Sequence, residues 1–416
     1  MKSCALRIRL PLCLTFVLIT GSWGSAWGEN WPGWRGPQRT GVTSDAGVPL
    51  DWSPEENVLW TAPLPGVGTS NPIVWGGRVF LTASEGRDEG ELHVLCFDRD
   101  SGRTLWDRRL WGTAPTLFYA RSGMASASPV TDGEHVWAFF GTGDVFCLDI
   151  DGGLVWQRAL SEEYGVFENR FGASSSPVLF EDLLIQQCDH YGDSYVIALD
   201  ARTGGNRWKG DRPEAWHSWS SPQIVPVEER FELVLSGSEK LDGYDPRTGT
   251  RLWTVRGLAR ECVPTPVLGA GRLISVSGPN GVHVAVRPGG TGDVTDSHVE
   301  WRNERGTSFI PSGIVVGSQY FVADDKGVGA CFDIQTGELL WRKRLGGRFT
   351  ASPVAAGSRV FFTNESGTTL ILDGARRDHH ELARNELGEE VYASAAISQG
   401  KLFLRTPRRL VCVGGK

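Results

Sequence analysis

Arginine, tryptophan, histidine and acidic side chains gather in short segments that separate apolar, β-branched runs. Guanidinium groups bind carboxylates and other anions with parallel N–H donors, and indole rings offer flat apolar surfaces. A polar or anionic ligand would suit such a set. We therefore take the following as candidate ligand-binding residues: Arg121, Arg170, Trp216, His217, Trp219, Lys240, Arg260, Glu261 and Arg348. The alternative is that these side chains only solvate loop tips.

Catalytic and metal-binding motifs do not emerge from the same segments. The sequence has no Ser-His-Asp arrangement, no glycine loop that would cradle a phosphate, no CxxC and no zinc-ligand spacing. His379 and His380 are adjacent, and neighbouring residues of a strand point to opposite faces, so we interpret them as part of a solvated edge. We identify no catalytic residue and no metal ligand.

The start of the chain indicates export. Residues 1–28 combine a basic beginning (Lys2, Arg7 and Arg9), an apolar core and small residues before position 29, which is typical of a signal peptide. Removing it would take the net charge from −7 to −10, because three positive charges are lost. Such a charge disfavours nucleic acid and anionic membranes as partners. We expect a periplasmic or extracellular protein with no transmembrane segment, and a monomer.

Six cysteines follow the signal peptide: Cys96, Cys147, Cys188, Cys262, Cys331 and Cys412. An exported protein can form disulfides. However, four of them occupy the same position in separate repeats, and equivalent positions of separate repeats need not meet. We favour buried free thiols over disulfides.

A repeated hairpin must position all of these loops. In LDARTGGNRW, residues 199–208, an apolar strand ends in Asp200, whose carboxylate can accept hydrogen bonds from the next turn. Gly204 supplies the positive φ of a tight turn, and Trp208 follows on the returning strand. One hairpin cannot bury an indole, so the copies must stack. The repeated aspartates and tryptophans to which we assign this docking role are Asp98, Trp106, Trp156, Asp200, Trp208, Asp245, Trp253, Asp333 and Trp341.

The repeats recur every 40 to 52 residues, which is the period of a four-stranded propeller blade. Eight units begin with a small polar residue, next to a proline in seven of them, and the last unit holds three strands. A strand at residues 57–64 precedes the first unit and can complete the last one. The prediction is an all-β, eight-bladed propeller at 57–416, closed by an N-terminal strand in the C-terminal blade. Residues 29–56 form an irregular Trp/Gly/Pro-rich arm that packs on it.

These Asp…Thr-Gly…Trp repeats resemble those of the PQQ-like β-propellers, the quinoprotein dehydrogenase-like superfamily. That group includes PQQ-dependent alcohol dehydrogenases and non-enzymatic BamB-like outer-membrane assembly factors. The resemblance implies a fold in which each Trp docks one blade on the next. It does not imply an activity, because enzymes and scaffolds share the motif.

The loops between blades, and those between the second and third strands of each blade, should ring one end of the central channel, which we call the mouth. We expect a binding or scaffold protein that takes a protein or a small polar ligand there, without a cofactor. The first alternative is an oxidoreductase using PQQ and Ca²⁺ on alcohols or sugars, with Trp216 and Trp219 as a floor and Glu261 or Asp189 as base. The sequence lacks the Cys-Cys pair of many such enzymes. The second alternative is a glycan-binding propeller.

Overall fold

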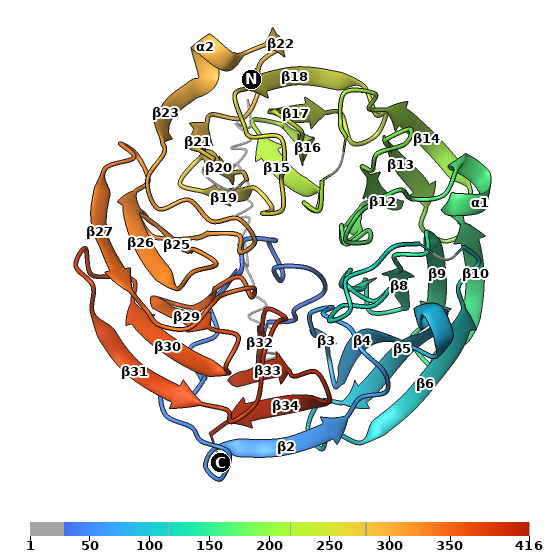
Figure 1. Ribbon diagram of the computed structural model, residues 1–416, viewed down its shortest axis with the longest axis horizontal. Coiled ribbons are helices and arrows are strands. Elements are labelled where there is room, and N and C mark those ends of the chain that lie inside the picture. Colours follow the sequence, from blue (N-terminus) through green and yellow to red (C-terminus); the bar gives the residue numbers. More distant parts are fainter. Residues whose placement is uncertain (1–28, 115, 217, 279–280, 416) are drawn as a thin grey trace, which may run out of the picture.

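Eight β-sheets stand around a central axis in the computed structural model (Figure 1). The structure describes residues 29–415 apart from 115, 217, 279 and 280, so the signal peptide prediction lies outside the described residues. Each sheet contains four antiparallel strands, and in seven of the eight sheets these follow chain order from the axis outwards. The predicted all-β, eight-bladed propeller is confirmed.

The first four blades are formed as follows. Blade 1 contains β3 (Ile73–Trp75), β4 (Arg78–Glu85), β5 (Glu91–Asp98) and β6 (Thr104–Trp111). Blade 2 contains β7 (Val130–Thr131), β8 (His135–Phe139), β9 (Asp144–Asp149) and β10 (Leu154–Ala159). Blade 3 contains β11 (Val178–Phe180), β12 (Leu183–Cys188), β13 (Tyr195–Asp200) and β14 (Asn206–Asp211). Blade 4 contains β15 (Gln223–Val227), β16 (Arg230–Gly237), β17 (Lys240–Tyr244) and β18 (Arg251–Arg256).

The other four blades complete the ring. Blade 5 contains β19 (Val267–Gly269), β20 (Arg272–Val276), β21 (His283–Val286) and β23 (Val299–Asn303). Blade 6 contains β24 (Ile314–Val316), β25 (Gln319–Ala323), β26 (Val328–Asp333) and β27 (Leu339–Arg344). Blade 7 contains β28 (Val354–Ala356), β29 (Arg359–Thr363), β30 (Thr368–Asp373) and β31 (Glu381–Glu386). Blade 8 contains β32 (Ala396–Ser398), β33 (Lys401–Arg405), β34 (Arg409–Gly414) and β2 (Val58–Pro63).

The ring closes where the two ends of the propeller meet. β2 is the outer strand of blade 8 and pairs antiparallel with β34, in a register that places Trp60 opposite Cys412 (Figure 1). Two short strands are added in parallel to this plan: β1 (Val42–Thr43) joins β28, and β22 (Gly292–Asp293) joins β18. The helical segments η1 (Arg87–Glu89), α1 (Leu160–Tyr164) and α2 (Thr295–His298) are short.

The repeated tryptophan lies against the turn glycine of the next blade. At Gly204, φ is +72°, and a Cβ would lie 2.8 Å from ring atoms of Trp156, so both the backbone and the indole require glycine. The Trp156 indole also donates a 3.0 Å hydrogen bond to the Ala201 carbonyl of that turn. The same contact recurs in the pairs Trp60–Gly102, Trp106–Gly152, Trp208–Gly249 and Trp301–Gly337.

Two of the tryptophans to which a docking role was assigned differ from this pattern. Trp253 lies in the apolar core between blades 4 and 5, but its indole donates to Glu232 of its own blade at 2.7 Å. The outer hairpin of blade 5 lacks the Asp-x-x-Thr-Gly turn; its Gly292 lies in β22 with no atom within 4 Å of its Cβ position, and α2 follows. Trp341 meets the edge of His379 at 5.0 Å and its indole nitrogen has no hydrogen-bond partner. His379 is therefore part of a blade contact and not only of a solvated edge.

Each turn aspartate caps its own hairpin. Asp200 Oδ1 accepts hydrogen bonds from the Arg202 and Thr203 amides and from the Thr203 hydroxyl, at 2.9 to 3.1 Å. Asp98 accepts a 2.7 Å bond from the Ser101 hydroxyl, and this bond holds the pKa of the Asp98 carboxyl below its ordinary value. The six predicted thiols are free and buried.

The N-terminal arm, residues 29–56, closes the end of the channel opposite the mouth (Figure 1). Its contacts reach every blade of the ring. In order of blade, they are Trp31 with Val74, Pro32 with Thr131, Arg39 with Leu179, Arg39 with Gln223, Trp34 with Thr265, Arg35 with Gly313, β1 with β28, and Glu29 with Ser398. Trp31 and Trp52 are buried, 1% and 4% exposed. The arm is thus a floor for the channel.

Candidate functional site

The channel forms a cup that opens at the mouth. The cavity has a volume of about 410 Å³, within the range of small-ligand sites. Its lining residues come from the loops between blades, from the loop between β29 and β30, and from the arm. Because the arm blocks the other end, a ligand must enter from the mouth.

A belt of small polar residues surrounds the cup at the start of each blade. In seven of the eight, the backbone amide donates to the side chain of the next blade, for example Ser128 to Ser176 at 3.0 Å and Ser312 to Ser352 at 2.9 Å. The belt runs through Asn71, Ser128, Ser176, Ser221, Thr265, Ser312, Ser352 and Ser394. These residues mark the predicted unit starts, and the belt explains why a small polar side chain recurs there: it links adjacent blades around the axis.

The floor of the cup is aromatic. Trp34 of the arm lines the cavity and donates from its indole nitrogen to the Thr265 hydroxyl at 3.0 Å. Arg35 lies just below and is only 3% exposed. Burial lowers the pKa of Arg35 to about 10, while its guanidinium donates to the Gly313 carbonyl at 2.7 Å.

One wall of the cup is aromatic as well. Tyr119, Phe171 and Trp219 come from three successive loops between blades. Tyr119 and Phe171 meet edge to face at 6.3 Å, and Phe171 lies 5.8 Å from Trp219. Trp219 is held in place, since its indole donates to the Gly172 carbonyl at 2.9 Å. Tyr119 and Phe171 are 49% and 43% exposed. They leave apolar ring surface available to a ligand.

Another wall of the cup is charged, and it begins in the loop that also carries Tyr119. Arg121 stacks over Tyr392 at 4.8 Å and forms a 3.4 Å ion pair with Glu365. Glu365 also accepts a 2.6 Å hydrogen bond from Thr350. Arg348 lines the same wall. Since Glu365 is paired, this wall presents a net positive charge to a ligand.

Two arginine–aromatic pairs lie further out. Arg260 stacks over Trp216 with 3.4 Å between its guanidinium carbon and the ring centre, and Trp216 is 49% exposed. Arg170 lies over Phe171 at 5.2 Å. Phe171 lines the cup, whereas Arg170, Trp216 and Arg260 do not, so these three extend the positive, aromatic surface beyond it.

Other sequence-predicted site residues lie elsewhere. Lys240 is nearly buried and pairs with Glu214, outside the residues that line the cup. Glu261 follows Arg260 and does not line the cup either. His217 lies outside the described residues. Asp189, considered as a base, forms a buried two-pronged pair with Arg212, at 2.8 and 3.1 Å.

The side chains that line the cup can be compared with those needed to bind PQQ and its Ca²⁺ ion. That ion requires several oxygen ligands, including carboxylates. Among the described lining residues the cup offers one carboxylate, Glu365, which is already bound to Arg121 and Thr350. Asn71 uses its side-chain amide on Ser128 at 2.7 Å. The residues of the cup do not fit this cofactor, and we derive no chemistry through it.

Tyr119, Phe171 and Trp34 are the site residues that the sequence did not single out. Tyr119 and Phe171 stand in stretches between repeats, where no period marks them. A search for aromatic residues confined to such stretches would have found both.

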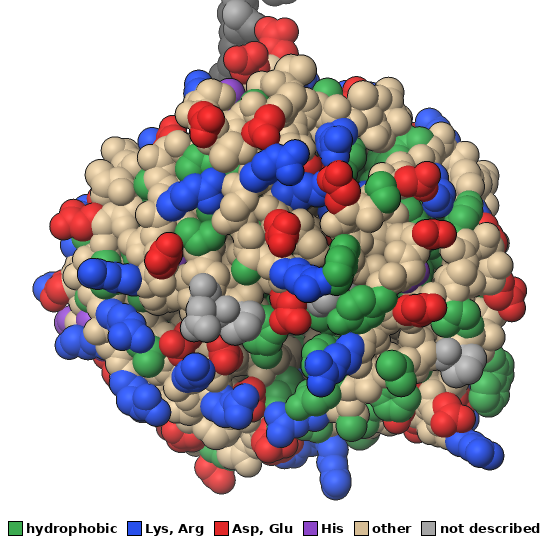
Figure 2. Space-filling model, turned by 45° about the horizontal axis from the view of Figure 1, so that its top comes forward, with side chains coloured by type: hydrophobic (Ala, Val, Ile, Leu, Met, Phe, Trp, Pro, Cys, Tyr) green, Lys and Arg blue, Asp and Glu red, His purple; other side chains and the backbone are tan. Residues whose placement is uncertain are grey.

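The molecular surface carries no extended area of one charge on the face drawn in Figure 2. Positive and negative side chains alternate there, with small groups of hydrophobic side chains between them. Among the described residues no helix is long and apolar enough to cross a membrane.

Comparisons with known proteins agree with the propeller fold. The family model described as "Outer membrane protein assembly factor BamB" matches residues 38–219, 192–311 and 237–415. No curated protein matches the sequence. The crystal structure of BamB from Moraxella catarrhalis has a TM-score of 0.61 at 14% identity, with 86% of this chain and 97% of that chain covered.

Quinoprotein enzymes share the fold. A europium-containing methanol dehydrogenase matches with a TM-score of 0.66 at 10% identity, over 90% of this chain and 89% of that chain. The quinohemoprotein alcohol dehydrogenase of Comamonas testosteroni matches with a TM-score of 0.66 at 14% identity, over 93% and 81%. These likenesses concern the fold alone. Because the family model spans nearly the whole propeller, the chain belongs to the family of PQQ-like repeat propellers described by BamB.

Proposed function

We propose that this propeller is an exported binding protein, and that its mouth holds an extended segment of a partner protein bearing aromatic and carboxylate side chains. The observation that carries the proposal is the cup, whose lining combines the exposed rings of Tyr119 and Phe171 with the guanidinium groups of Arg121 and Arg348. Exposed aromatic rings beside arginines are characteristic of energetic centres in protein interfaces. The family to which the chain belongs is described by an assembly factor.

The positive charge of the arginines in the cup favours a ligand that carries a carboxylate. A chain of net charge −7 presents arginines at this opening, with Glu365 already neutralised by Arg121. A carboxylate entering the cup would meet Arg348 and would compete with Glu365 for Arg121. An aromatic side chain beside it would contact Phe171 and Tyr119. A peptide that carries both groups matches both walls.

The experiment is a selection of peptides from a displayed library on the mature protein, followed by calorimetric titration of the selected peptides. We expect aromatic residues next to Asp, Glu or a terminal carboxylate. Phe171→Ala should weaken binding at least tenfold, since stacking and burial of one ring account for at least about 1.4 kcal/mol. Trp111→Ala is the matched control, because Trp111 is 71% exposed at the end of β6 and does not line the cup.

The two alternatives are outcomes of parallel titrations. Saturable stabilisation by PQQ with Ca²⁺, together with dye reduction by an alcohol or sugar, would replace the binding proposal with an oxidoreductase. Binding of glycans that is lost in Trp216→Ala and Arg260→Ala would indicate a glycan receptor. Peptide binding that is equal in Phe171→Ala and in the native protein would exclude the cup as the binding surface.

A further inference from the structure

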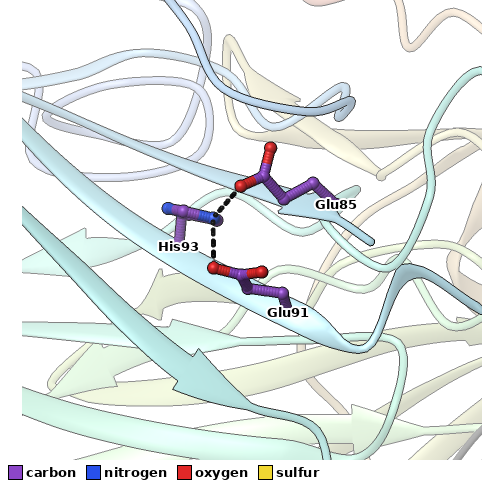
Figure 3. A group of neighbouring side chains, drawn as sticks. All are labelled: Glu85, Glu91 and His93. Atoms are coloured by element: carbon purple, nitrogen blue, oxygen red, sulfur yellow. Dashed lines mark ion pairs between the residues drawn. The ribbon is translucent and has the colours of Figure 1, made fainter. Parts of the chain in front are cut away.

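Three potential ligand side chains meet at the mouth end of blade 1, outside the cup. Glu85 ends β4 and Glu91 begins β5, and the two are directly paired in the sheet register. His93 lies two residues along β5, so it projects from the same face as Glu91. Figure 3 shows the imidazole directed between the two carboxylates.

The imidazole is buried and faces the carboxylates without a hydrogen bond. The His93 side chain is 0% exposed, and its Nε2 has no hydrogen-bond partner. Nε2 lies 3.3 Å from Glu85 Oε1 and 3.8 Å from Glu91 Oε1. One ligand atom from each of the three residues falls within 4.8 Å of the others. A buried polar atom left without a partner is costly, so its presence needs an explanation.

The other ring nitrogen is fixed by a carboxylate of the next strand. His93 Nδ1 lies 2.9 Å from Asp107 Oδ1 on β6. When Nδ1–H donates to Asp107, Nε2 carries its lone pair toward Glu85 and Glu91. A carboxylate that orients an imidazole in this way is the usual outer partner of a metal-bound histidine.

We propose that Glu85, Glu91 and His93 bind a divalent transition-metal ion, for which Zn²⁺ is the best match. Zn²⁺ binds imidazole nitrogen and carboxylate oxygen at about 2.0–2.2 Å, which places neighbouring ligand atoms of a tetrahedron about 3.3–3.6 Å apart. The distances of 3.3 and 3.8 Å from Nε2 are close to this range. Ca²⁺ and Mg²⁺ prefer oxygen ligands and suit the imidazole less well.

Access to the group is available from solvent. The Glu85 side chain is 34% exposed and that of Glu91 is 18% exposed, whereas His93 is enclosed. An ion can therefore enter past the glutamates and leave its fourth position to water. Three protein ligands with one open position are the arrangement of accessible zinc sites.

Arg109 competes with the ion. Its Nη1 lies 3.3 Å from Glu91 Oε1, and it is the residue opposite His93 on β6. The positive charge of the Arg109 guanidinium repels a metal ion that would bind to Glu91. Removal of this charge should therefore tighten metal binding, the opposite of what loss of a ligand does.

A second group of the same composition serves as the control. Asp132, Glu134 and His135 also place ligand atoms within 4.8 Å. There, however, both acidic residues are exposed, and Asp132 already accepts hydrogen bonds from the Glu134 and His135 amides, at 2.9 and 2.7 Å. His135 keeps partial exposure. Its Nδ1 is also buried without a hydrogen-bond partner, 3.8 Å from Asp132 Oδ2, but the ring as a whole is less enclosed than that of His93 and no carboxylate of the described residues orients its other nitrogen.

The test is calorimetric titration of Zn²⁺ into the metal-free mature protein, with Co²⁺ absorption as a second readout. We expect one saturable site and the intense visible bands of four-coordinate Co²⁺. Glu85→Gln and Glu91→Gln should each weaken binding at least tenfold, and Asp107→Asn about tenfold. Arg109→Gln should strengthen binding, and His135→Gln should leave it unchanged.

Two results would contradict the proposed metal site. Absence of saturable Zn²⁺ binding at neutral pH would overturn the proposal, as would loss of binding in His135→Gln only. Such results would identify the group as an ion pair between a protonated His93 and its glutamates. The glutamate variants keep the test decisive even where a His93 variant fails to fold, because both glutamates are partly exposed.

Discussion

The two ends of the channel are built from the same repeats but differ in which residues they use. At the arm end, contacts are made by buried residues such as Trp31 and Arg35, which reach backbone groups of the blades. At the mouth, Tyr119, Phe171 and Arg121 leave part of their surface to solvent. Buried residues at the arm end hold the ring, and partly exposed residues at the mouth form the proposed site. A substitution should therefore affect stability at one end and binding at the other.

The largest effect is expected for Trp31→Ala at the arm end. Removing an indole that is 1% exposed should lower the free energy of unfolding by about 3–5 kcal/mol. Chemical denaturation measures this loss. The counterpart is Trp216→Ala at the mouth, which should cost about 0.5 kcal/mol or less because the ring is half exposed. Equal losses in the two variants would refute the distinction between the ends.

Gly204→Ala should have the next largest effect. The new methyl group would meet the Trp156 ring at 2.8 Å on a backbone with φ of +72°. Strain and overpacking together should lower the free energy of unfolding by about 2–4 kcal/mol. Gly205→Ala is the adjacent control, because its Cβ would meet only the Thr203 hydroxyl at 3.4 Å. A similar loss at Gly205 would show that the turn, and not the indole contact, sets the requirement.

Arg121→Ala should separate binding from stability. The ion pair with Glu365 is about half exposed on the arginine side, so its loss should change stability by about 1 kcal/mol or less. Affinity for a peptide selected on the cup should fall about tenfold, and binding should become less sensitive to salt. Calorimetry at two salt concentrations measures both. An unchanged affinity would remove Arg121 from the site.

The smallest effect concerns pH. The Ser101 hydroxyl holds the pKa of Asp98 below its ordinary value in the folded chain. The ionised form therefore favours folding above the pKa of the unfolded chain, and this stabilisation is lost as the pH falls toward the folded-state value. Asp98→Asn should reduce the difference in stability between neutral pH and about pH 3. Thermal unfolding across this range measures it, and an unchanged slope would assign the acid sensitivity to other carboxylates.

The sequence predicted the ring because its signals are local and repeated. Asp200, Gly204 and Trp208 lie within one hairpin, and the eight unit starts along the chain give the number of blades. The exceptions depend on distant chain segments. The Trp253 indole donates a hydrogen bond to Glu232 on another strand of its blade, and no spacing in the sequence predicts that pairing.

The candidate site was harder to predict because ring closure brings its parts together. Arg121 and Glu365 are 244 residues apart in sequence, and Trp34 reaches Thr265 from the arm. The group at His93 depends on strand register, which pairs Glu85 with Glu91 and leaves no metal-ligand motif in the sequence. Lys240 carried a suitable charge, but its side chain turns to Glu214.

Hydrogen exchange with and without a selected peptide tests the central claim most directly. If the peptide binds in the cup, amide exchange should become slower in the mouth loops at residues 116–128 and 165–176, which carry Tyr119 and Phe171. Amide exchange in the arm at residues 29–45 should stay unchanged. Protection confined to the arm or to the outer strands, with the mouth loops unchanged, would contradict it.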